Sequence, residues 1–513
     1  MNRAESRSES NPIDRATNRI AVIDVGSNSV RMVIYPATVL ASPPLFNEKA
    51  MCGLGRNQTP GGALSSEAMQ LALDTIRRFA HLAKAMEVGV IDAVATAAVR
   101  DASNGAEFVD LIARETGISV RILPGDEEAR LAGRGVKAAS PKSRGLVGDL
   151  GGGSLELIHL DPGDGDGVGQ RISLPLGTLR LASMDINGAD LDQKIDAALA
   201  DVHWLQQATG AELYIVGGAW RSLGRLEMAR TGYPLRVLHG YTLPSARVAA
   251  MCQLFAGLSL ESLRGIEAVP KDRLDTLALA ARVLGRLLRH SGAHRVVFSD
   301  HGLRDGILYD HLTAEHRTAD PLLASCRLTA LATARDHDNG LGHGHGDGAI
   351  LTDWLSPLFP NEGEDERRLR FAAGLLSDIG WRIHSDERAD HAMADVLRAP
   401  LIGLDHSQRF KLALAIRFRY THRRDSHWVK PYEQLVGDDD RLWSRRVGQA
   451  LRLAHTLSGG VMELLSGYHL TMDEDAITMH CTTGGQRLIG EAAAKRLAAM
   501  ARSFKRSGRI VAT

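Results

Sequence analysis

The chain has 513 residues, with 61 lysines and arginines balanced by 61 aspartates and glutamates. This length predicts about three domains, and a composition of 44% apolar and 24% charged residues excludes a disordered chain. A net charge of zero argues against a protein that works on nucleic acid or on an anionic membrane surface, but it does not exclude a local basic groove.

The distribution of cysteines and apolar residues predicts a cytoplasmic protein. The four cysteines lie far apart, which indicates reduced thiols and no disulfide frame or zinc site. They are Cys52, Cys252, Cys326 and Cys481. No apolar run approaches the ~18 residues that a membrane span needs. Residues 1–18 are polar, lack the apolar segment of a signal peptide and are expected to form a disordered tail.

The first ordered element is a predicted β-hairpin in residues 19–35, RIAVIDVGSNSVRMVIY. An apolar strand runs into a tight turn of small residues, and a second apolar strand follows with no room for a helix. This excludes a P-loop and a Rossmann turn, which both open a helix after their glycines. The pattern returns one domain length later in residues 143–160, SRGLVGDLGGGSLELIHL, and predicts an internal duplication.

The rest of the first 310 residues alternates between helical and strand periodicity, which predicts two α/β sheet domains. Helices are predicted over residues 65–85, 105–116 (capped by Asn104), 126–138 (capped by Asp126), 190–208, 246–258 and 272–289. Strands are predicted over residues 88–96, 118–123, 213–216 and 296–298.

Helical periodicity dominates from about residue 315 onward. Helices are predicted around residues 371–376, 389–397, 408–420 and 442–457, with one strand pair within 468–482. A Gly/His-rich loop is expected at 336–348 and a solvated, charged connection at 361–368. The predicted organisation is a tail at 1–18, α/β domains at 19–138 and 139–314, and a helical domain at 315–513.

The two glycine turns are candidate phosphate sites, because small residues between strands expose successive backbone N–H groups. The first comprises Gly26, Ser27, Asn28 and Ser29, with Arg31 close behind, and the second comprises Gly151, Gly152, Gly153 and Ser154. Each could be an ordinary glycine-rich hairpin turn. The duplication, with an aspartate leading each turn, favours phosphate binding.

Carboxylates near these turns are candidates for metal binding and proton transfer. Asp24 and Asp149 are predicted to end strands, where they can hold Mg²⁺, and Glu156 can share that ion or point outward. Glu127 and Glu128 fall in a first helical turn. They either stabilise the helix dipole or supply a general base that deprotonates an attacking water.

Four motifs in this order resemble the exopolyphosphatase / guanosine pentaphosphate phosphohydrolase (Ppx/GppA) family of the actin-like phosphotransferase superfamily. They are DVGSNSVR at 24–31, ATAAVRDASN at 95–104, GDEEAR at 125–130 and DLGGGSLE at 149–156. VGGAWRSLGRL at 216–226 and SDHGLRDGILY at 299–309 are similar to later motifs of the family. The resemblance implies two actin-like (ribonuclease H-like) α/β domains followed by an all-α HD-like C-terminal domain.

The resemblance also implies roles for individual residues. Glu128 matches the catalytic carboxylate, Asp149 and Glu156 match carboxylates near the metal, and Arg100 and Arg273 match arginines that hold phosphate. Trp220 breaks a usual Gly-Thr pair and argues against recognition of adenosine.

The C-terminal region departs from the family at its metal site. Ser377 stands where a histidine is usual before Asp378, which predicts a non-catalytic remnant even if His345 and His391 approach Asp378. Residues 417–430 are rich in arginine. They are either a solvated helix face at a dimer rim or a basic lane for a polyanion.

The expected activity is Mg²⁺-dependent removal of terminal phosphate from inorganic polyphosphate, with Mn²⁺ as a substitute and a monovalent cation as an additional ion. The first alternative is hydrolysis of guanosine pentaphosphate to the tetraphosphate. An actin-like kinase or ATPase, and a sensor that binds guanosine polyphosphates without turnover, are further alternatives. A homodimer with no nucleic-acid partner is expected.

Overall fold

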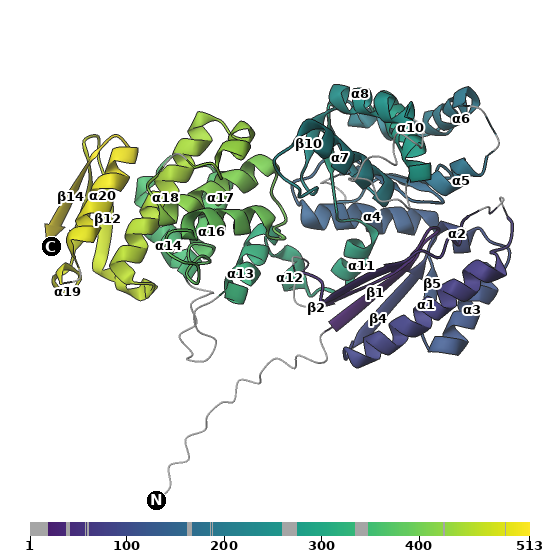
Figure 1. Cartoon of the computed structure of the whole chain (residues 1–513), viewed down its shortest axis with the longest axis horizontal. Coiled ribbons are helices and arrows are strands. Elements are labelled where there is room, and N and C mark those ends of the chain that lie inside the picture. Colours follow the sequence, from purple (N-terminus) through teal and green to yellow (C-terminus); the bar gives the residue numbers. More distant parts are fainter. Residues whose placement is uncertain are drawn as a thin grey trace, which may run out of the picture. The chain divides into compact units, whose positions relative to one another are not determined.

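The computed structural model describes residues 19–36, 40, 42–56, 58, 61–161, 167–184, 186, 188–258, 274–333, 347–423, 426–487 and 489–512. The chain forms two compact units (Figure 1). The N-terminal unit comprises Met1–Thr231 and Tyr241–Thr318, and the C-terminal unit comprises Gly232–Gly240 and Ala319–Thr513. The predicted tail, Arg273, His345 and most of the predicted Gly/His-rich loop lie outside the described residues. No described helix combines the length and apolar character that a membrane span needs.

The first sheet of the N-terminal unit has the strand order β3-β2-β1-β4-β5. Its strands are β1 (Arg19–Val25), β2 (Val30–Pro36), β3 (Phe46–Ala50), β4 (Val90–Ala95) and β5 (Val120–Ile122). The neighbours β1, β2 and β3 pair antiparallel, whereas β1, β4 and β5 pair parallel. The predicted first hairpin is therefore confirmed as β1 and β2.

The second sheet repeats this arrangement and has the order β10-β11-β9-β6-β7-β8. Its strands are β6 (Gly145–Leu150), β7 (Leu155–Leu160), β8 (Arg171–Leu174), β9 (Glu212–Val216), β10 (Thr242–Pro244) and β11 (Arg295–Phe298). The strands β8, β7 and β6 pair antiparallel and β6, β9 and β11 pair parallel, as in the first sheet. Common pairing in both sheets confirms the internal duplication.

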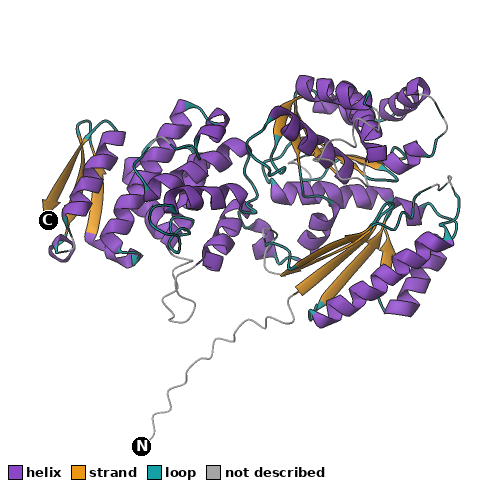
Figure 2. Cartoon of the chain, viewed as in Figure 1, coloured by secondary structure: helices purple, strands orange, loops and turns teal. Residues whose placement is uncertain are grey.

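Helices cover the faces of these sheets (Figure 2). They are α1 (Ser66–Ala85), α2 (Ala97–Arg100), α3 (Gly105–Thr116), α4 (Gly125–Ala139), α5 (Thr178–Ala182), α6 (Gly188–Ala200), η1 (His203–Ala208), α7 (Gly218–Thr231), α8 (Ser245–Ala256), α10 (Leu274–Ser291), α11 (Leu303–His311) and α12 (Ala314–Thr318). The apolar stripe of α1 buries Leu73, Ile76 and Phe79 in the core that includes β1 and β2. This follows from helical spacing of apolar side chains.

One predicted helix cap is confirmed in position and the other is wrong. Asn104 is the N-cap of α3, but its side chain makes no capping hydrogen bond and instead bonds both backbone groups of Leu64, at 2.8 and 3.2 Å. Asp126 lies inside α4, which begins at Gly125 after Pro124. Proline favours the start of a helix because its fixed φ suits the first turn and its missing N–H would have no helical partner there.

Helices α4 and α11 cross closely and join the two sheets. Although α4 precedes β6, it packs against β7 and β8, and α11 packs against both α4 and β1. A Cβ on Gly306 would lie 1.9 Å from the carbonyl oxygen of Leu131, and one on Gly135 would lie 2.0 Å from that of Gly302. Glycine is therefore needed at both contacts.

The C-terminal unit is mainly helical, with one small sheet. Its helices are α13 (Pro321–Thr333), α14 (Asp347–Leu355), η3 (Ser356–Leu358), α15 (Glu364–Leu375), α16 (Arg388–Arg398), α17 (His406–Tyr420), η4 (Lys430–Leu435), α18 (Asp438–Ser458), η5 (Met462–Gly467), α19 (Thr483–Gln486) and α20 (Glu491–Ser503). The predicted strand pair is confirmed as β12 (Tyr468–Met472) and β13 (Ala476–Cys481).

Two details of this unit differ from the sequence-based expectation. The unit is not all-α, because β14 (Ser507–Ala512) adds a third strand parallel to β13. The segment 361–368 is not simply a solvated connection, since α15 begins within it and Glu362 pairs with the buried Arg370 at 2.7 Å. An ion pair between residues eight positions apart decided burial there, and the composition of the segment alone does not show that pairing.

Candidate active site

The two glycine loops have the same backbone turn, which places them alike at the ends of β1 and β6. The amide of Gly26 donates to the carbonyl of Ser29 at 3.0 Å, and the amide of Gly151 donates to that of Ser154 at 3.0 Å. We call residues 26–29 the first glycine loop and residues 151–154 the second. Within the described part of the chain, no hydrogen bond uses the amides at positions 27, 28, 152 and 153. Such successive N–H groups suit an oxyanion.

The loops face each other closely enough to exclude larger side chains. A Cβ on Gly152 would lie 3.1 Å from the Cβ of Ser27. A Cβ on Gly153 would lie 2.6 Å from that of Ala97 and 2.8 Å from the hydroxyl of Ser27. Both loops are also braced from outside: Gly55 donates to the carbonyl of Ser27 at 2.7 Å, and the start of α5 donates to the carbonyls of residues 151 and 152.

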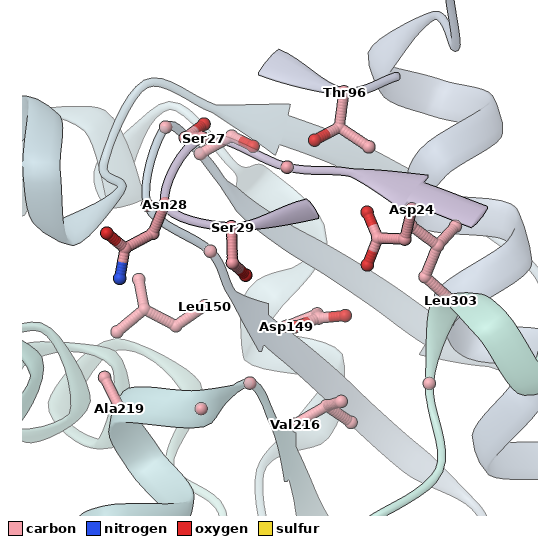
Figure 3. A pocket seen from close by; sticks show the side chains of 18 of the residues that line it. Asp24, Ser27, Asn28, Ser29, Thr96, Asp149, Leu150, Val216, Ala219 and Leu303 are labelled. Atoms are coloured by element: carbon pink, nitrogen blue, oxygen red, sulfur yellow. The ribbon is translucent and has the colours of Figure 1, made fainter. Parts of the chain in front are cut away.

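One cavity of about 190 Å³ lies between these loops (Figure 3). Its lining includes every site residue expected from the sequence apart from Arg100 and the undescribed Arg273: Asp24, Gly26, Ser27, Asn28, Ser29, Arg31, Glu128, Asp149, Gly151, Gly152, Gly153, Ser154 and Glu156. Figure 3 shows Asp24 and Asp149 reaching into it from the two duplicated strands.

Glu128 lies in the first turn of α4, 8% exposed, and its Oε2 accepts a hydrogen bond from Nη1 of Arg100 at 2.7 Å. Burial raises the pKa of Glu128 to about 7; Arg100 opposes this rise, and the charges of Asp149 and Asp24 add to it. A carboxylate that titrates near neutral pH is suited to accept a proton from water. Arg100 also donates to the carbonyl of Leu123 at 3.1 Å, so it holds Glu128 from behind the cavity.

The second sheet contributes two further carboxylates, the partly exposed Asp149 and the buried Glu156. Burial raises the pKa of Asp149 to about 6, with a further contribution from Asp24. Burial and the charges of Glu128 and Asp149 raise the pKa of Glu156 well above its ordinary value. Glu156 also accepts a hydrogen bond from Oγ of Ser173 at 2.8 Å.

The chemistry of these carboxylates suits a hard divalent cation. They repel one another, and a positive ion would relieve that repulsion. Their oxygen atoms are also the ligands that such ions prefer. No three histidine, cysteine, aspartate or glutamate side chains among the described residues are grouped closely enough to hold an ion. A bound ion would thus need oxygens from phosphate and water.

Three arginines supply the opposite charge. Arg31, Arg221 and Arg304 line the cavity, and Nη1 of Arg304 donates to Asp24 at 2.9 Å. Burial, followed by the charges of Arg304 and Arg221, lowers the pKa of Arg31 to about 10. Crowded guanidinium groups that repel one another are suited to receive an anion, and phosphate matches their planar donors.

Sequence reasoning missed Arg221 and Arg304 as site residues. Both stand in segments that were singled out as similar to later family motifs, and their position within those motifs was the available signal. Lys49, Thr96 and Asp300 also line the cavity and were missed. Thr96 and Asp300 also stand in quoted motifs, whereas nothing in the local sequence of Lys49 indicates its place in the cavity.

Trp220, whose presence in the sequence argued against recognition of adenosine, does not line the cavity. Its indole is fully buried beneath β6 and donates from Nε1 to the carbonyl of Ala280 at 2.9 Å. The neighbouring Ala219 lines the cavity instead.

In the C-terminal unit, Ser377 is buried, and its Oγ lies 2.8 Å from Nε2 of His455. Asp378 lies 3.5 Å from the guanidinium of Arg419, and His391 lies 3.9 Å from Glu387. No metal-binding group is found among the described residues of this unit either.

The predicted basic stretch is only partly exposed: His422, Arg423 and Lys430 are exposed, whereas Arg417 and Arg419 are not. Arg417 is buried and pairs with Asp390 at 2.7 Å, and Arg419 stacks on Tyr420 with 4.5 Å between guanidinium and ring centre. Arg424 lies outside the described residues. An exposed lane cannot begin at Arg417 and Arg419, because both are engaged in packing; a shorter basic surface at residues 422–430 stays a prediction.

Duplicated sheets with facing phosphate-type loops define an actin-like phosphotransferase fold. The model of the Ppx/GppA phosphatase family matches residues 33–315, more than half of the chain. The model of a second family, described as "Exopolyphosphatase, C-terminal", matches residues 351–511. The chain belongs to the Ppx/GppA phosphatase family and is an enzyme of phosphoanhydride hydrolysis. The expected α/β class, with actin-like domains followed by a mainly helical region, is confirmed.

Relatives carry both activities in their names. A guanosine-5'-triphosphate,3'-diphosphate pyrophosphatase of Aeromonas hydrophila is 25% identical and aligns over 90% of this chain and 92% of its own length. Exopolyphosphatase 1 of Mycobacterium tuberculosis is 28% identical over 58% of this chain and 89% of its own length. The crystal structure of an exopolyphosphatase from Cytophaga hutchinsonii is 25% identical, with a TM-score of 0.52, over 57% of this chain and 99% of that one.

Proposed function

We propose that this protein is an exopolyphosphatase that removes terminal phosphate from inorganic polyphosphate with the help of Mg²⁺. The observation that carries the proposal is a single cavity whose lining combines anion-binding groups with carboxylates. Two glycine loops with unused amides and three arginines suit a phosphate chain, and five carboxylates line the same cavity.

In the proposed reaction, the loops, Arg221 and Arg304 hold the terminal phosphate and neutralise its oxygens, and Arg31 holds the phosphate behind it. Glu128 accepts a proton from a water molecule whose oxygen forms a bond to the terminal phosphorus. The bridging P–O bond breaks, and the shortened chain leaves with the electron pair of that bond. Arg100 orients Glu128 through their hydrogen bond and keeps it ionised near neutral pH.

Asp24, Asp149 and Glu156 are the candidates to hold Mg²⁺, at most two of them in direct contact and the remainder through water. Mn²⁺ is a substitute with similar ligand preferences. Bound Mg²⁺ would neutralise charge on the phosphate oxygens during transfer. A monovalent cation, expected from the sequence, stays a prediction that activity assays with K⁺ or Na⁺ would test.

The choice of inorganic polyphosphate rests on the lining of the cavity. None of the described residues that line it is aromatic, so no ring is available to stack on a guanine base. Guanosine pentaphosphate remains the second candidate, because the relative from Aeromonas hydrophila, named for a guanosine substrate, matches this chain over nearly all of its length.

We also propose a cytoplasmic location, which suits four free, buried cysteines, and a homodimeric state. Sedimentation of the purified protein would test the homodimer.

The test is substitution of Glu128 by glutamine, followed by measurement of phosphate release from polyphosphate and from guanosine pentaphosphate with Mg²⁺. Loss of the general base is expected to lower kcat by about 10²–10⁴-fold, while polyphosphate still binds. A matched control is Glu127→Gln, since Glu127 pairs with Arg130 and does not line the cavity. Near-normal turnover by Glu128→Gln would exclude the proposed role, and faster wild-type release from guanosine pentaphosphate would favour the second candidate.

A further inference from the structure

The duplicated sheets carry matching rows of three side chains at the level of the cavity. In the first sheet, Asp24 on β1 lies opposite Arg31 on β2, which lies opposite Lys49 on β3. In the second sheet, Asp149 on β6 lies opposite Glu156 on β7, which lies opposite Ser173 on β8. Residues opposite each other in antiparallel strands share a face of the sheet.

The two rows differ in charge although they share their geometry. After the leading aspartate, the first row continues with two cations, whereas the second continues with a carboxylate and a hydroxyl. A polyanion is attracted along the first row and repelled along the second. The side chain of Arg31 is also fixed in place, because its Nε donates to Oδ1 of Asn47 on β3 at 2.9 Å.

The two rows also differ at their outer ends, where one is covered by a helix and the other lines the cavity. The N-terminus of α4 covers the second row: a Cβ on Gly125 would lie 2.7 Å from the Cβ of Ser173. Ser173 does not line the cavity, whereas Lys49, at the corresponding place on the edge strand β3, does and is partly exposed. The cavity is thus closed at the end of the acidic row and lined by a lysine at the end of the basic row.

We propose that the phosphate chain leaves the cavity over the first sheet, so that phosphates behind the terminal one lie on Arg31 and then on Lys49. This inference rests on the proposed function and adds a direction and a further phosphate subsite to it. Lys49 is then a specificity-determining residue that senses whether the substrate continues as a chain of phosphates.

The experiment compares wild type, Lys49→Gln and Lys49→Arg on long polyphosphate and on pyrophosphate. Lys84→Gln is the matched control, because Lys84 is an exposed lysine of α1 that does not line the cavity. Loss of one charge-assisted contact predicts an increase in KM of about tenfold for long polyphosphate. The kcat is expected to stay within about twofold, because the contact is made equally in the ground and transition states.

Three further results are expected: Lys49→Arg keeps KM close to wild type, pyrophosphate hydrolysis changes little in Lys49→Gln, and Lys84→Gln behaves as wild type. Dissociation constants for long polyphosphate, measured in the Glu128→Gln background with and without Lys49→Gln, should show the same weakening. The Lys49 subsite is overturned if KM and affinity are unchanged in Lys49→Gln, if pyrophosphate and long chains are affected equally, or if Lys84→Gln has the same effect. If wild type releases no phosphate from polyphosphate at all, the proposed function fails, and this outcome is distinct from failure of the subsite.

Discussion

Glu128 shows how single-residue environments prepare this site for chemistry at neutral pH. Burial among other carboxylates raises its pKa to about 7, and the Arg100 guanidinium limits that rise. The group must lose its proton to act as a base, so kcat/KM should fall as the pH drops below about 7. This fall is the acidic limb of the pH profile, and its position depends on how far burial raises, and Arg100 lowers, the pKa of Glu128.

We expect Arg100→Met to move the acidic limb of the kcat/KM profile to higher pH by about one unit or more, because an opposite charge in contact with a carboxylate lowers its pKa by roughly that amount. The measurement is phosphate release between pH 5 and 9 at saturating Mg²⁺. Arg130→Met is the control, since Arg130 pairs with Glu127 and Asp310 and does not contact Glu128. A limb that stays in place, or moves to lower pH, would contradict the role assigned to Arg100.

At the level of secondary structure, the crossing of α4 and α11 holds the two halves of the site together. One helix carries Glu128 in its first turn, and the other carries Arg304 in its first turn. Their backbones approach so closely at Gly135 and Gly306 that a methyl group would collide with a carbonyl oxygen. Small residues at the crossing therefore set the separation between the base and one of the phosphate ligands.

Gly306→Ala is expected to destabilise the protein by about 1–3 kcal/mol or more, as overpacking of a rigid contact does. Urea unfolding measures this change. Gly257→Ala is the control in the same unit, because its Cβ would lie 3.6 Å from the nearest atoms, an ordinary van der Waals contact. Wild-type stability of Gly306→Ala would mean that the two helices separate without cost, contrary to the close crossing.

At the scale of the whole molecule, the two units have separate hydrophobic cores. The segment Gly232–Gly240 leaves the N-terminal unit and places Leu235 in the core of the C-terminal unit, and the chain then returns to β10. The cavity belongs wholly to the N-terminal unit. The C-terminal unit holds its own buried ion pairs, of which Arg417 with Asp390 is one.

Breaking that pair should affect the C-terminal unit. Arg417→Ser leaves Asp390 without its guanidinium partner, and such a loss costs about 3–5 kcal/mol. Arg423→Ser, at an exposed side chain, should change stability by less than about 0.5 kcal/mol.

Tryptophan fluorescence during urea unfolding is a suitable probe, because the C-terminal unit contains most of the tryptophans: Trp354, Trp381, Trp428 and Trp443. If Arg423→Ser destabilised the protein more than Arg417→Ser, the exposed basic lane would have to be reconsidered.

Local sequence determined the parts of this protein that depend on short-range physics. Strand–turn–strand patterns predicted both glycine-loop hairpins, and helical spacing predicted α1 and α3 closely. The motifs in these local elements indicated the family and included most of the residues that line the cavity. Short elements with weak periodicity, such as β3 and β14, were missed because pairing with a neighbouring strand stabilises them.

Tertiary structure decided which charges meet. Arg221, Arg304 and Lys49 enter the cavity only because segments far apart in the chain converge on the loops at residues 26–29 and 151–154. The same cause buried Arg417, which local composition suggested was solvated. The sequence around a charged residue does not show which residue it pairs with, because long-range packing decides that pairing. For the same reason, the two matching rows of side chains could be recognised only from the pairing of the strands.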